Sequence, residues 1–304
     1  MSQVNGDPFV SVIVPVWNDR TRLRLLLDAL SAQAYPKSRY EVIVVDNGST
    51  DGSDAVAARY AVVVLSETGA QSSYAARNRG IEAAKGSILA FTDSDCIPMR
   101  DWLGNGVRAL TEHNADLAGG QVRFFFSPSK TGAELYDSIS NFTQEATIHT
   151  HNVAPTANLF VRTQVFELVG YFRGDVKSGG DTIWTRRATE LGHRLIYAPG
   201  AVVSHPARRF LPMVRKQYRV GRGHAEQWSA SARRPRRVLN QAVGTVLRAK
   251  GPGQIRQMLA DGGQRVEGFR LVRVWFAGVT SRVVTATGNL VTLFRGPPDV
   301  YRNR

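Results

Sequence analysis

Two carboxylates, Asp93 and Asp95, stand two residues apart directly after the apolar run Ile88–Phe91. Such a short run is typical of a buried strand. Carboxylates this close repel each other unless a cation or hydrogen-bond donors lie beside them. Mg²⁺ and Mn²⁺ prefer oxygen ligands and commonly take one or two carboxylates, while water and substrate phosphates complete the shell. The pattern therefore predicts a divalent metal site, and a solvent-exposed acidic turn is the alternative.

A further acid, Asp46, follows the apolar run Glu41–Val45 and opens the polar segment Asp46–Asp51. A carboxylate at the end of a buried strand can accept hydrogen bonds from a nucleobase N–H or a ribose hydroxyl in the crevice beyond it. The segment is also rich in residues that form turns and cap helices. A plain strand-to-helix turn is therefore the alternative.

Asp181 stands where a helix is expected to begin, after Gly179 and Gly180. The positive end of the helix dipole and the unpaired backbone N–H groups stabilise a carboxylate in its charged form. Such a carboxylate can act as a base for an alcohol whose proton leaves only as the C–O bond forms. A helix cap and nothing more is the alternative.

The elements that would position these acids alternate between two periodicities over the first 125 residues. Four short, β-branched apolar runs fit strands buried on both faces: Val10–Val16, Glu41–Val45, Ala61–Leu65 and Ile88–Phe91. Amphipathic segments of helical length separate or follow them: Thr21–Ala32, Gly52–Tyr60, Tyr74–Ala84 and Asp101–Glu112. This alternation predicts an α/β fold with a mostly parallel central sheet flanked by helices, and polar residues at the strand ends would share one ligand crevice.

Length and composition narrow the class of protein. A chain of 304 residues with 43% hydrophobic residues is long and apolar enough for one large domain or two smaller ones, which excludes disorder as the main state. The single Cys96 excludes an internal disulfide scaffold and a thiolate zinc site, and it favours a reducing compartment. Residues 1–8 are polar and lack the apolar stretch of a signal peptide, so we expect a cytoplasmic protein.

The positive charge is concentrated in the last third of the chain. Lys and Arg number 39 against 25 Asp and Glu, and residues 206–304 hold 20 of the basic side chains but only 4 of the acidic ones. This distribution predicts a nearly neutral body followed by a cationic appendage that meets nucleic acid, a membrane surface or phosphate-bearing substrates. A solvated basic face without a partner is the alternative.

Four segments together carry a family resemblance: Val12–Asn18, Val44–Asp51, Ala76–Gly80 and Phe91–Asp95. In order and spacing they resemble the nucleotide-sugar-binding half of glycosyltransferase family 2, and the resemblance covers about residues 9–225. It implies the GT-A fold, which is Rossmann-like, over residues 1–225, with a donor half at about 9–125 and an acceptor half at about 126–225. Residues 226–304 would be a basic, partly amphipathic helical extension.

The resemblance implies an inverting, hexosyltransferase-type enzyme. Its donor would be a UDP-, GDP- or dTDP-sugar, and its acceptor would be a hydroxyl of a sugar or lipid-linked molecule in cell-surface polysaccharide or glycolipid synthesis. Position by position, the residues that would bind the donor are Pro15, Trp17, Asn18, Asp46, Arg77, Asn78 and Asp93. Asp95, helped by Asp93 and His205, would hold Mn²⁺ or Mg²⁺.

The acceptor half supplies the remaining expected site residues. Asp181 falls on the general base of the family pattern, and Asn158, Gly180 and Trp184 fall beside the acceptor. Gly180 departs from that pattern, because a Glu precedes the Asp in the segment that it resembles.

Two other functions fit parts of the sequence. A sugar-phosphate nucleotidyltransferase would carry a glycine-rich basic loop after the first strand, and Trp17–Arg20 contains no glycine. A nucleic-acid-binding protein would account for the basic tail but would leave the acids unexplained, so we expect no nucleic-acid partner. The chain also lacks the P-loop, dinucleotide-binding and nucleophile-elbow motifs.

Residues 271–295 mix apolar residues with arginines. This composition favours peripheral attachment to an anionic inner membrane face. A helical cap packed on the catalytic body is the alternative.

Overall fold

The computed structural model describes residues 6–141, 143–226 and 235–295. It contains an eight-stranded sheet with the strand order β3-β2-β1-β4-β7-β6-β8-β5. The strands are β1 Val10–Val16, β2 Tyr40–Asp46, β3 Val63–Ser66, β4 Ile88–Thr92, β5 Ile97–Pro98, β6 Leu117–Phe125, β7 Asn158–Arg162 and β8 Leu195–Pro206. The strands β3, β2, β1 and β4 are parallel. The strand β7 runs antiparallel to both β4 and β6, which joins this parallel half to the pair β6–β8.

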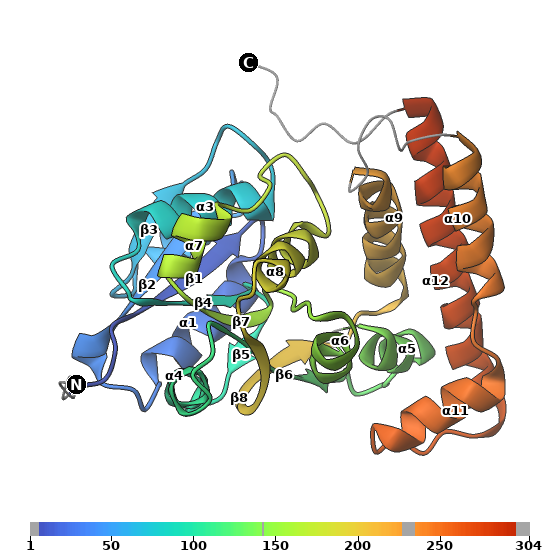
Figure 1. The fold of residues 1–304 in the computed structure, drawn as a ribbon. Coiled ribbons are helices and arrows are strands. Elements are labelled where there is room, and N and C mark those ends of the chain that lie inside the picture. The colour runs from blue at the N-terminus through green and yellow to red at the C-terminus, as the bar shows by residue number, and fades with distance from the viewer. Residues whose placement is uncertain (1–5, 142, 227–234, 296–304) are drawn as a thin grey trace.

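Helices cover both faces of the sheet (Figure 1). They are α1 Arg20–Ser31, α2 Ser53–Ala57, α3 Ser73–Ala83, α4 Trp102–Glu112, α5 Gly132–Ser140, α6 Gln144–His151, α7 Gln164–Val169 and α8 Gly180–Glu190, with a 3₁₀ turn η1 at Lys37–Arg39. One core joins β1 to α1, α2 and α4, and a second core joins the other face to α3, α7 and α8. The predicted α/β fold with a mostly parallel sheet is confirmed.

The strand β1 shows why these runs are apolar throughout. Successive side chains of a strand point to opposite faces. Val12 and Val14 accordingly join the core beneath α1, while Ile13 joins the core beneath α3. Because helices cover both faces, every position of the strand is buried.

The structure differs from the sequence-based elements around α2 and β3. The helix expected over Gly52–Tyr60 ends at Ala57, and the strand expected from Ala61 begins at Val63. Residues 58–62 form turns and bends instead. The Tyr60 hydroxyl donates to Asp28 at 2.7 Å, which ties this segment to α1. Since β3 is an edge strand with exposed valines, its start is weakly specified by burial.

The C-terminal helices lie together beside the sheet (Figure 1). They are α9 Phe210–Glu226, α10 Pro235–Leu247, α11 Pro252–Asp261 and α12 Gly268–Arg295. The last three lie within the extension predicted at 226–304, whose helical character is confirmed over its described residues, whereas α9 falls in the half predicted at about 126–225. A third apolar core joins α5, α9, α11 and α12 through Leu135, Met213, Leu259 and Val274. The extension therefore packs on the body, although its stretches 227–234 and 296–304 lie outside the described residues. Among the described helices, none combines the length and the apolarity that a membrane crossing needs.

The helices α9 and α12 approach each other closely through two glycines, Gly221 and Gly288. A Cβ atom at Gly221 would lie 2.1 Å from the carbonyl oxygen of Thr285, and one at Gly288 would lie 2.5 Å from that of Tyr218. Both obstacles are backbone atoms, which cannot rotate away as a side chain can. The absence of side chains at these two positions is therefore a requirement of this helix contact.

The Gly288→Ala variant tests this contact. We expect it to lower the free energy of unfolding by about 1–3 kcal/mol, because the two helix backbones must separate. The matched control is Gly253→Ala in α11, where an added Cβ meets no atom within 4 Å. That control should gain about 0.5–1 kcal/mol from its higher helix propensity. Urea denaturation measures both values, and equal changes in the two variants would contradict the close approach.

Candidate functional site

The loops that follow β1 and β2 are tied together at the rim of the sheet. Asn18 has a positive φ of 50°, and its side-chain oxygen accepts the Thr50 N–H at 2.7 Å. Its own backbone N–H donates to the Ser49 hydroxyl at 2.9 Å. Asp46 accepts backbone N–H groups of Gly48 and Ser49 at 3.1 and 3.0 Å. Asn18 and Asp46 therefore shape the two loops.

Pro15 and Trp17, in contrast, line a cleft beside these loops. The Trp17 side chain is 53% exposed, which is unusual for so large an aromatic ring. An exposed indole at the edge of a cleft offers a flat apolar surface on which a planar ring can stack.

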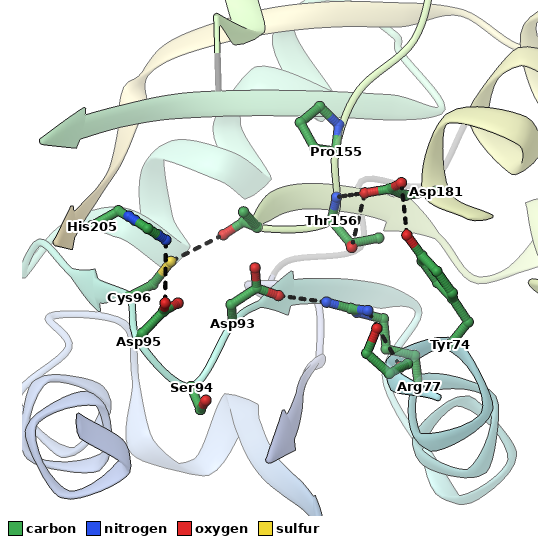
Figure 2. A network of polar contacts seen from close by, with 12 residues as sticks. Tyr74, Arg77, Asp93, Ser94, Asp95, Cys96, Pro155, Thr156, Asp181 and His205 are labelled. Atoms are coloured by element: carbon green, nitrogen blue, oxygen red, sulfur yellow. Dashed lines mark hydrogen bonds and ion pairs between the residues drawn. The ribbon is translucent and has the colours of Figure 1, made fainter. Parts of the chain in front are cut away.

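Asp93 comes at the end of β4 and pairs with Arg77 of α3 (Figure 2). The Arg77 side chain is only 4% exposed, whereas that of Asp93 is 30% exposed. The Arg77 guanidinium also donates to the Ser73 carbonyl at 3.3 Å, which ties it to the start of its own helix. Arg77 thus neutralises Asp93 from behind while the carboxylate still reaches the cleft.

Asp95 contacts a different pair of basic side chains. Its Oδ2 lies 3.3 Å from Nε2 of the buried His205 in β8 and 3.8 Å from the Arg208 guanidinium. Burial raises the pKa of Asp95, but the attraction of His205, Arg208 and Arg22 outweighs burial and holds the pKa well below its ordinary value. Asp95 is therefore ionised at any working pH. The repulsion between the two acids is relieved by the chain's own cations, so their charge alone does not demand a metal.

Asp181 lies in the first turn of α8, after Gly179 in the left-handed conformation. Its Oδ1 accepts the Tyr74 hydroxyl at 3.0 Å and its neighbour's N–H, from Thr182, at 2.9 Å. Its Oδ2 accepts the Thr156 N–H at 3.1 Å and the Thr156 hydroxyl at 3.4 Å. Figure 2 shows this carboxylate near the two acids that follow β4, with Asp93 turned toward Arg77 and Asp95 toward His205.

These groups share one cleft of about 720 Å³. Its lining includes Pro15, Trp17, Tyr74, Arg77, Asp93, Asp95, Thr156, Lys177, Asp181, Arg208, Lys216 and Arg219. The last three come from α9 and the segment that leads into it, and they form a basic wall. A cleft with acids at the sheet edge and cations on the facing helix suits a ligand that carries phosphate.

Lys216 is held in this wall by a hydrogen bond from its Nζ to the Asn141 side-chain oxygen at 2.7 Å. Burial, followed by repulsion from Arg208 and Arg219, lowers the pKa of Lys216 to about 7, against partial compensation from Asp137 and Asp95. A lysine whose charge is this costly to keep gains from any anion that enters the cleft.

Other expected site residues lie in the framework. The Asn78 side chain bridges both backbone groups of Phe172, at 2.8 and 3.0 Å. Asn158 is buried and donates to the Gln121 and Ala201 carbonyls while accepting the Trp102 indole N–H. The structure does not bring these two amides to the cleft.

Two of the expected acceptor residues are also packed away. The Trp184 indole stacks on Phe166 with ring centroids 4.3 Å apart and donates to the Gly170 carbonyl. Gly180 is buried against the ring of Tyr74. His205 stands behind Asp95 and does not line the cleft itself.

Tyr74, Thr156 and Lys177 line the cleft but were not anticipated from the sequence. Tyr74 precedes the Ala76–Gly80 motif by two residues, and Thr156 precedes the expected acceptor residue Asn158 by two. Proximity to a motif is the one signal that could have found them, because neither residue type stands out in its surroundings.

The residues at the end of β4 fit a divalent cation. Asp95 is ionised and Asp93 reaches the cleft, so carboxylate oxygens of the kind that Mg²⁺ and Mn²⁺ prefer are available. Among the described residues, no three His, Cys, Asp or Glu side chains cluster in a metal-binding geometry. A cation at Asp95 would therefore complete its shell with substrate phosphates and water.

Sequence comparisons find relatives over nearly the whole chain. A family model described as glycosyl transferase family 2 matches residues 11–168. The glycosyltransferase AglE of Haloferax volcanii is 41% identical over 295 residues, which make up 95% of this chain and 97% of AglE. The pre-mycofactocin glycosyltransferase of Mycobacterium tuberculosis is 30% identical over 208 residues, but these make up only 43% of that protein.

Solved structures share the fold. The mannosyltransferase PcManGT of Pyrobaculum calidifontis, in complex with GDP-Man and Mn²⁺, matches 97% of this chain and 77% of its own with a TM-score of 0.56 at 20% identity. A fragment of S. aureus TarS in complex with UDP matches 95% of this chain and 92% of its own with a TM-score of 0.54 at 18% identity. These neighbours confirm the predicted GT-A fold.

The Lys216→Met variant tests how much stability the protein loses by burying the charge of Lys216 in the basic wall. We expect it to raise the unfolding temperature by a few degrees at pH 7, because a charge that burial and two arginines disfavour is removed. The pKa of Lys216 is lower in the folded state than in the unfolded state, so the loss of stability caused by the charged lysine is fully present below about pH 7. This loss fades as the pH rises toward 10.5. The rise in unfolding temperature caused by Lys216→Met should therefore shrink over the same pH range. Calorimetric melting at pH 6, 7 and 9 measures it, and a lower melting temperature at pH 6 would contradict this account.

Proposed function

The chain belongs to glycosyltransferase family 2, and from this premise we propose that its cleft transfers a sugar from a nucleoside-diphosphate donor to an acceptor hydroxyl with inversion. The predictions of a glycosyltransferase and of its family are confirmed, which decides against the nucleotidyltransferase. One observation carries the mechanism: the held carboxylate Asp181 and the ionised Asp95 line the same cleft. A base and a diphosphate site are thereby within reach of one bound sugar.

The donor would lie along the rim of the sheet. Pro15 and the exposed Trp17 offer a surface for the nucleoside, while Arg77 and the basic wall of α9 suit the phosphate oxygens. Asn18 and Asp46 would contribute by fixing the loops, since their side chains already bind backbone groups. Binding the donor in one fixed orientation removes much of the entropic barrier to reaction.

Mn²⁺ or Mg²⁺ would be held by Asp95, with Asp93 and the donor's own oxygens, and His205 would support Asp95 from behind. When bound, the cation neutralises negative charge on the departing nucleoside diphosphate. The Mn²⁺ in PcManGT supports this assignment.

Asp181 receives the proton. The acceptor oxygen attacks the anomeric carbon from the side opposite the diphosphate, the bond from carbon to the diphosphate oxygen breaks, and the hydroxyl proton passes to the carboxylate. This single displacement inverts the anomeric centre. The hydrogen bonds from Tyr74, Thr156 and Thr182 hold the carboxylate in place for the transfer.

The Asp181→Asn variant separates the base from the donor site. We expect sugar transfer to fall by about 10²–10⁴-fold, because an amide cannot take up the proton. Donor binding, measured by titration calorimetry, should stay within about twofold, since the donor's contacts lie elsewhere in the cleft.

Asp175→Asn is the matched control, because Asp175 is exposed, lies just before α8 and pairs only with Arg173 among the contacts described. A control that lost as much activity as Asp181→Asn, or an Asp181→Asn variant that no longer bound donor, would assign Asp181 a different role.

The acceptor side would include a membrane surface. We infer that the extension attaches peripherally to an anionic membrane at its cytoplasmic face, where lipid-linked acceptors can be met. The helix α10 exposes an apolar stripe at helical spacing, Leu239, Val243, Val246 and Leu247. The first half of α12 exposes another, Phe269, Val272 and Phe276, and the exposed Arg270 and Arg273 stand beside it. Apolar side chains flanked by arginines suit an anionic interface.

Flotation with vesicles of phosphatidylglycerol and phosphatidylcholine tests this surface. The wild-type chain should float with the vesicles, and Phe269→Asp/Phe276→Asp should lose most of that binding because two exposed aromatic side chains that would enter the membrane interface become charged. The matched control is Leu168→Asp/Leu191→Asp, which alters exposed leucines of the body. Equal flotation of both double variants, or no flotation of the wild type, would rule out membrane attachment through these helices.

A further inference from the structure

Tyr74 occupies the space that a side chain at position 180 would need. A Cβ atom at Gly180 would lie 2.9 Å from Cδ2 and Cε2 of the Tyr74 ring. The ring cannot easily move away, because Phe172 packs on it with ring centroids 6.1 Å apart and the Arg77 guanidinium lies 5.5 Å from its centre. The family pattern has Glu at position 180. This chain has glycine there, because the Tyr74 ring leaves no space for a side chain.

The hydroxyl of the same ring is fixed on Asp181. Tyr74 is 6% exposed, and its hydroxyl donates to Asp181 Oδ1 at 3.0 Å. Burial, followed by the charge of Asp181, raises the pKa of Tyr74 far above its ordinary value. The phenol therefore keeps its proton and remains a donor at every pH at which the enzyme could work.

The two oxygens of Asp181 are not equally engaged. Oδ1 accepts two hydrogen bonds of ordinary length, from Tyr74 and Thr182. Oδ2 accepts one such bond, from the Thr156 N–H, and a long contact of 3.4 Å from the Thr156 hydroxyl. The long contact is the weakest of the four, so an incoming hydroxyl can replace it at the least cost.

We propose that Tyr74 is a positioning residue for sugar transfer, whose hydroxyl holds Asp181 Oδ1 so that Oδ2 receives the acceptor proton and whose ring requires glycine at position 180. The inference rests on the proposed function, since it takes Asp181 to be the base. A lone pair of the acceptor oxygen forms the new bond to the anomeric carbon while the bond from that carbon to the diphosphate oxygen breaks and its electrons leave with the diphosphate. The acceptor proton moves to Oδ2, and the electrons of its O–H bond stay on the acceptor oxygen. Tyr74 itself gives up no proton.

The Tyr74→Phe variant removes the hydroxyl and keeps the ring. We expect kcat to fall by about tenfold or more, as for the loss of a hydrogen bond to a charged group, while KM for the donor stays within about twofold. The matched control is Tyr35→Phe, because Tyr35 is also 6% exposed and its hydroxyl donates to the Pro8 carbonyl, outside the cleft. The control should leave both constants unchanged.

The pH profile distinguishes positioning from packing. A carboxylate that loses a donor holds its proton more tightly, so the acid limb of the kcat profile should move to higher pH in Tyr74→Phe but not in Tyr35→Phe. The other charged groups of the cleft are the same in both variants: Arg77, Asp93, Asp95, Lys177, Arg208, Lys216 and Arg219.

The ring is tested by stability, independently of activity. Gly180→Ala should lower the melting temperature by a few degrees in the wild-type background, where the new methyl group meets the Tyr74 ring. In a Tyr74→Ala background the same substitution should cost less than half as much. Equal costs in the two backgrounds would overturn the spatial part of the proposal.

The outcomes separate this inference from the proposed function. If Asp181→Asn loses transfer while Tyr74→Phe behaves like Tyr35→Phe, the base stands and the positioning role is overturned. If Asp181→Asn transfers sugar as the wild type does, the assigned base is wrong and the positioning role falls with it. A slow Tyr74→Phe variant with a displaced acid limb and unchanged donor KM supports the proposal.

Discussion

The pairing of two neighbouring carboxylates with different basic side chains is the interaction on which the cleft depends. Asp93 is held by Arg77 from α3, and Asp95 is held by His205 from β8 and by Arg208. The end of β4 is thus fixed between elements that are far apart in the chain. Because Arg77, His205 and Arg208 already contact the two acids, the rim is preorganised, and a ligand need not assemble it.

The two sides of the cleft favour ligand groups of opposite charge. Acids at the sheet edge favour a cation, whereas the wall of α9 favours an anion, so a bound cation and diphosphate would satisfy both sides together. Burial among arginines disfavours the charged form of Lys216 and lowers its pKa to about 7. Asp181 does not take part in these ion pairs, since neutral donors and backbone N–H groups hold it. A base that is not paired with a cation remains able to accept a proton.

The sequence predicted what local patterns determine, namely the buried strands, the polar residues at their ends and the helical extension. It could not predict which motif residues turn inward. Asn78 and Asn158 bind backbone groups of distant segments, and an amide that binds a carbonyl looks the same in a sequence as one that binds a ligand. Tyr74 escaped notice because its partner Asp181 lies 107 residues away. The need for glycine at position 180 is likewise invisible in the sequence, because the Tyr74 ring that fills this space comes from a distant segment.

The central claim is that the rim at Asp95 binds a nucleoside-diphosphate sugar together with a divalent cation. Titration calorimetry of UDP-, GDP- and dTDP-sugars against the wild-type chain and Asp95→Asn, with Mn²⁺ or with EDTA, tests it most directly. We predict that one nucleotide class binds the wild type with Mn²⁺, and that EDTA or Asp95→Asn weakens binding by about tenfold or more, as for the loss of a charged ligand group. Equal binding under all four conditions would contradict the claim, as would no binding of any of these sugars to the wild type.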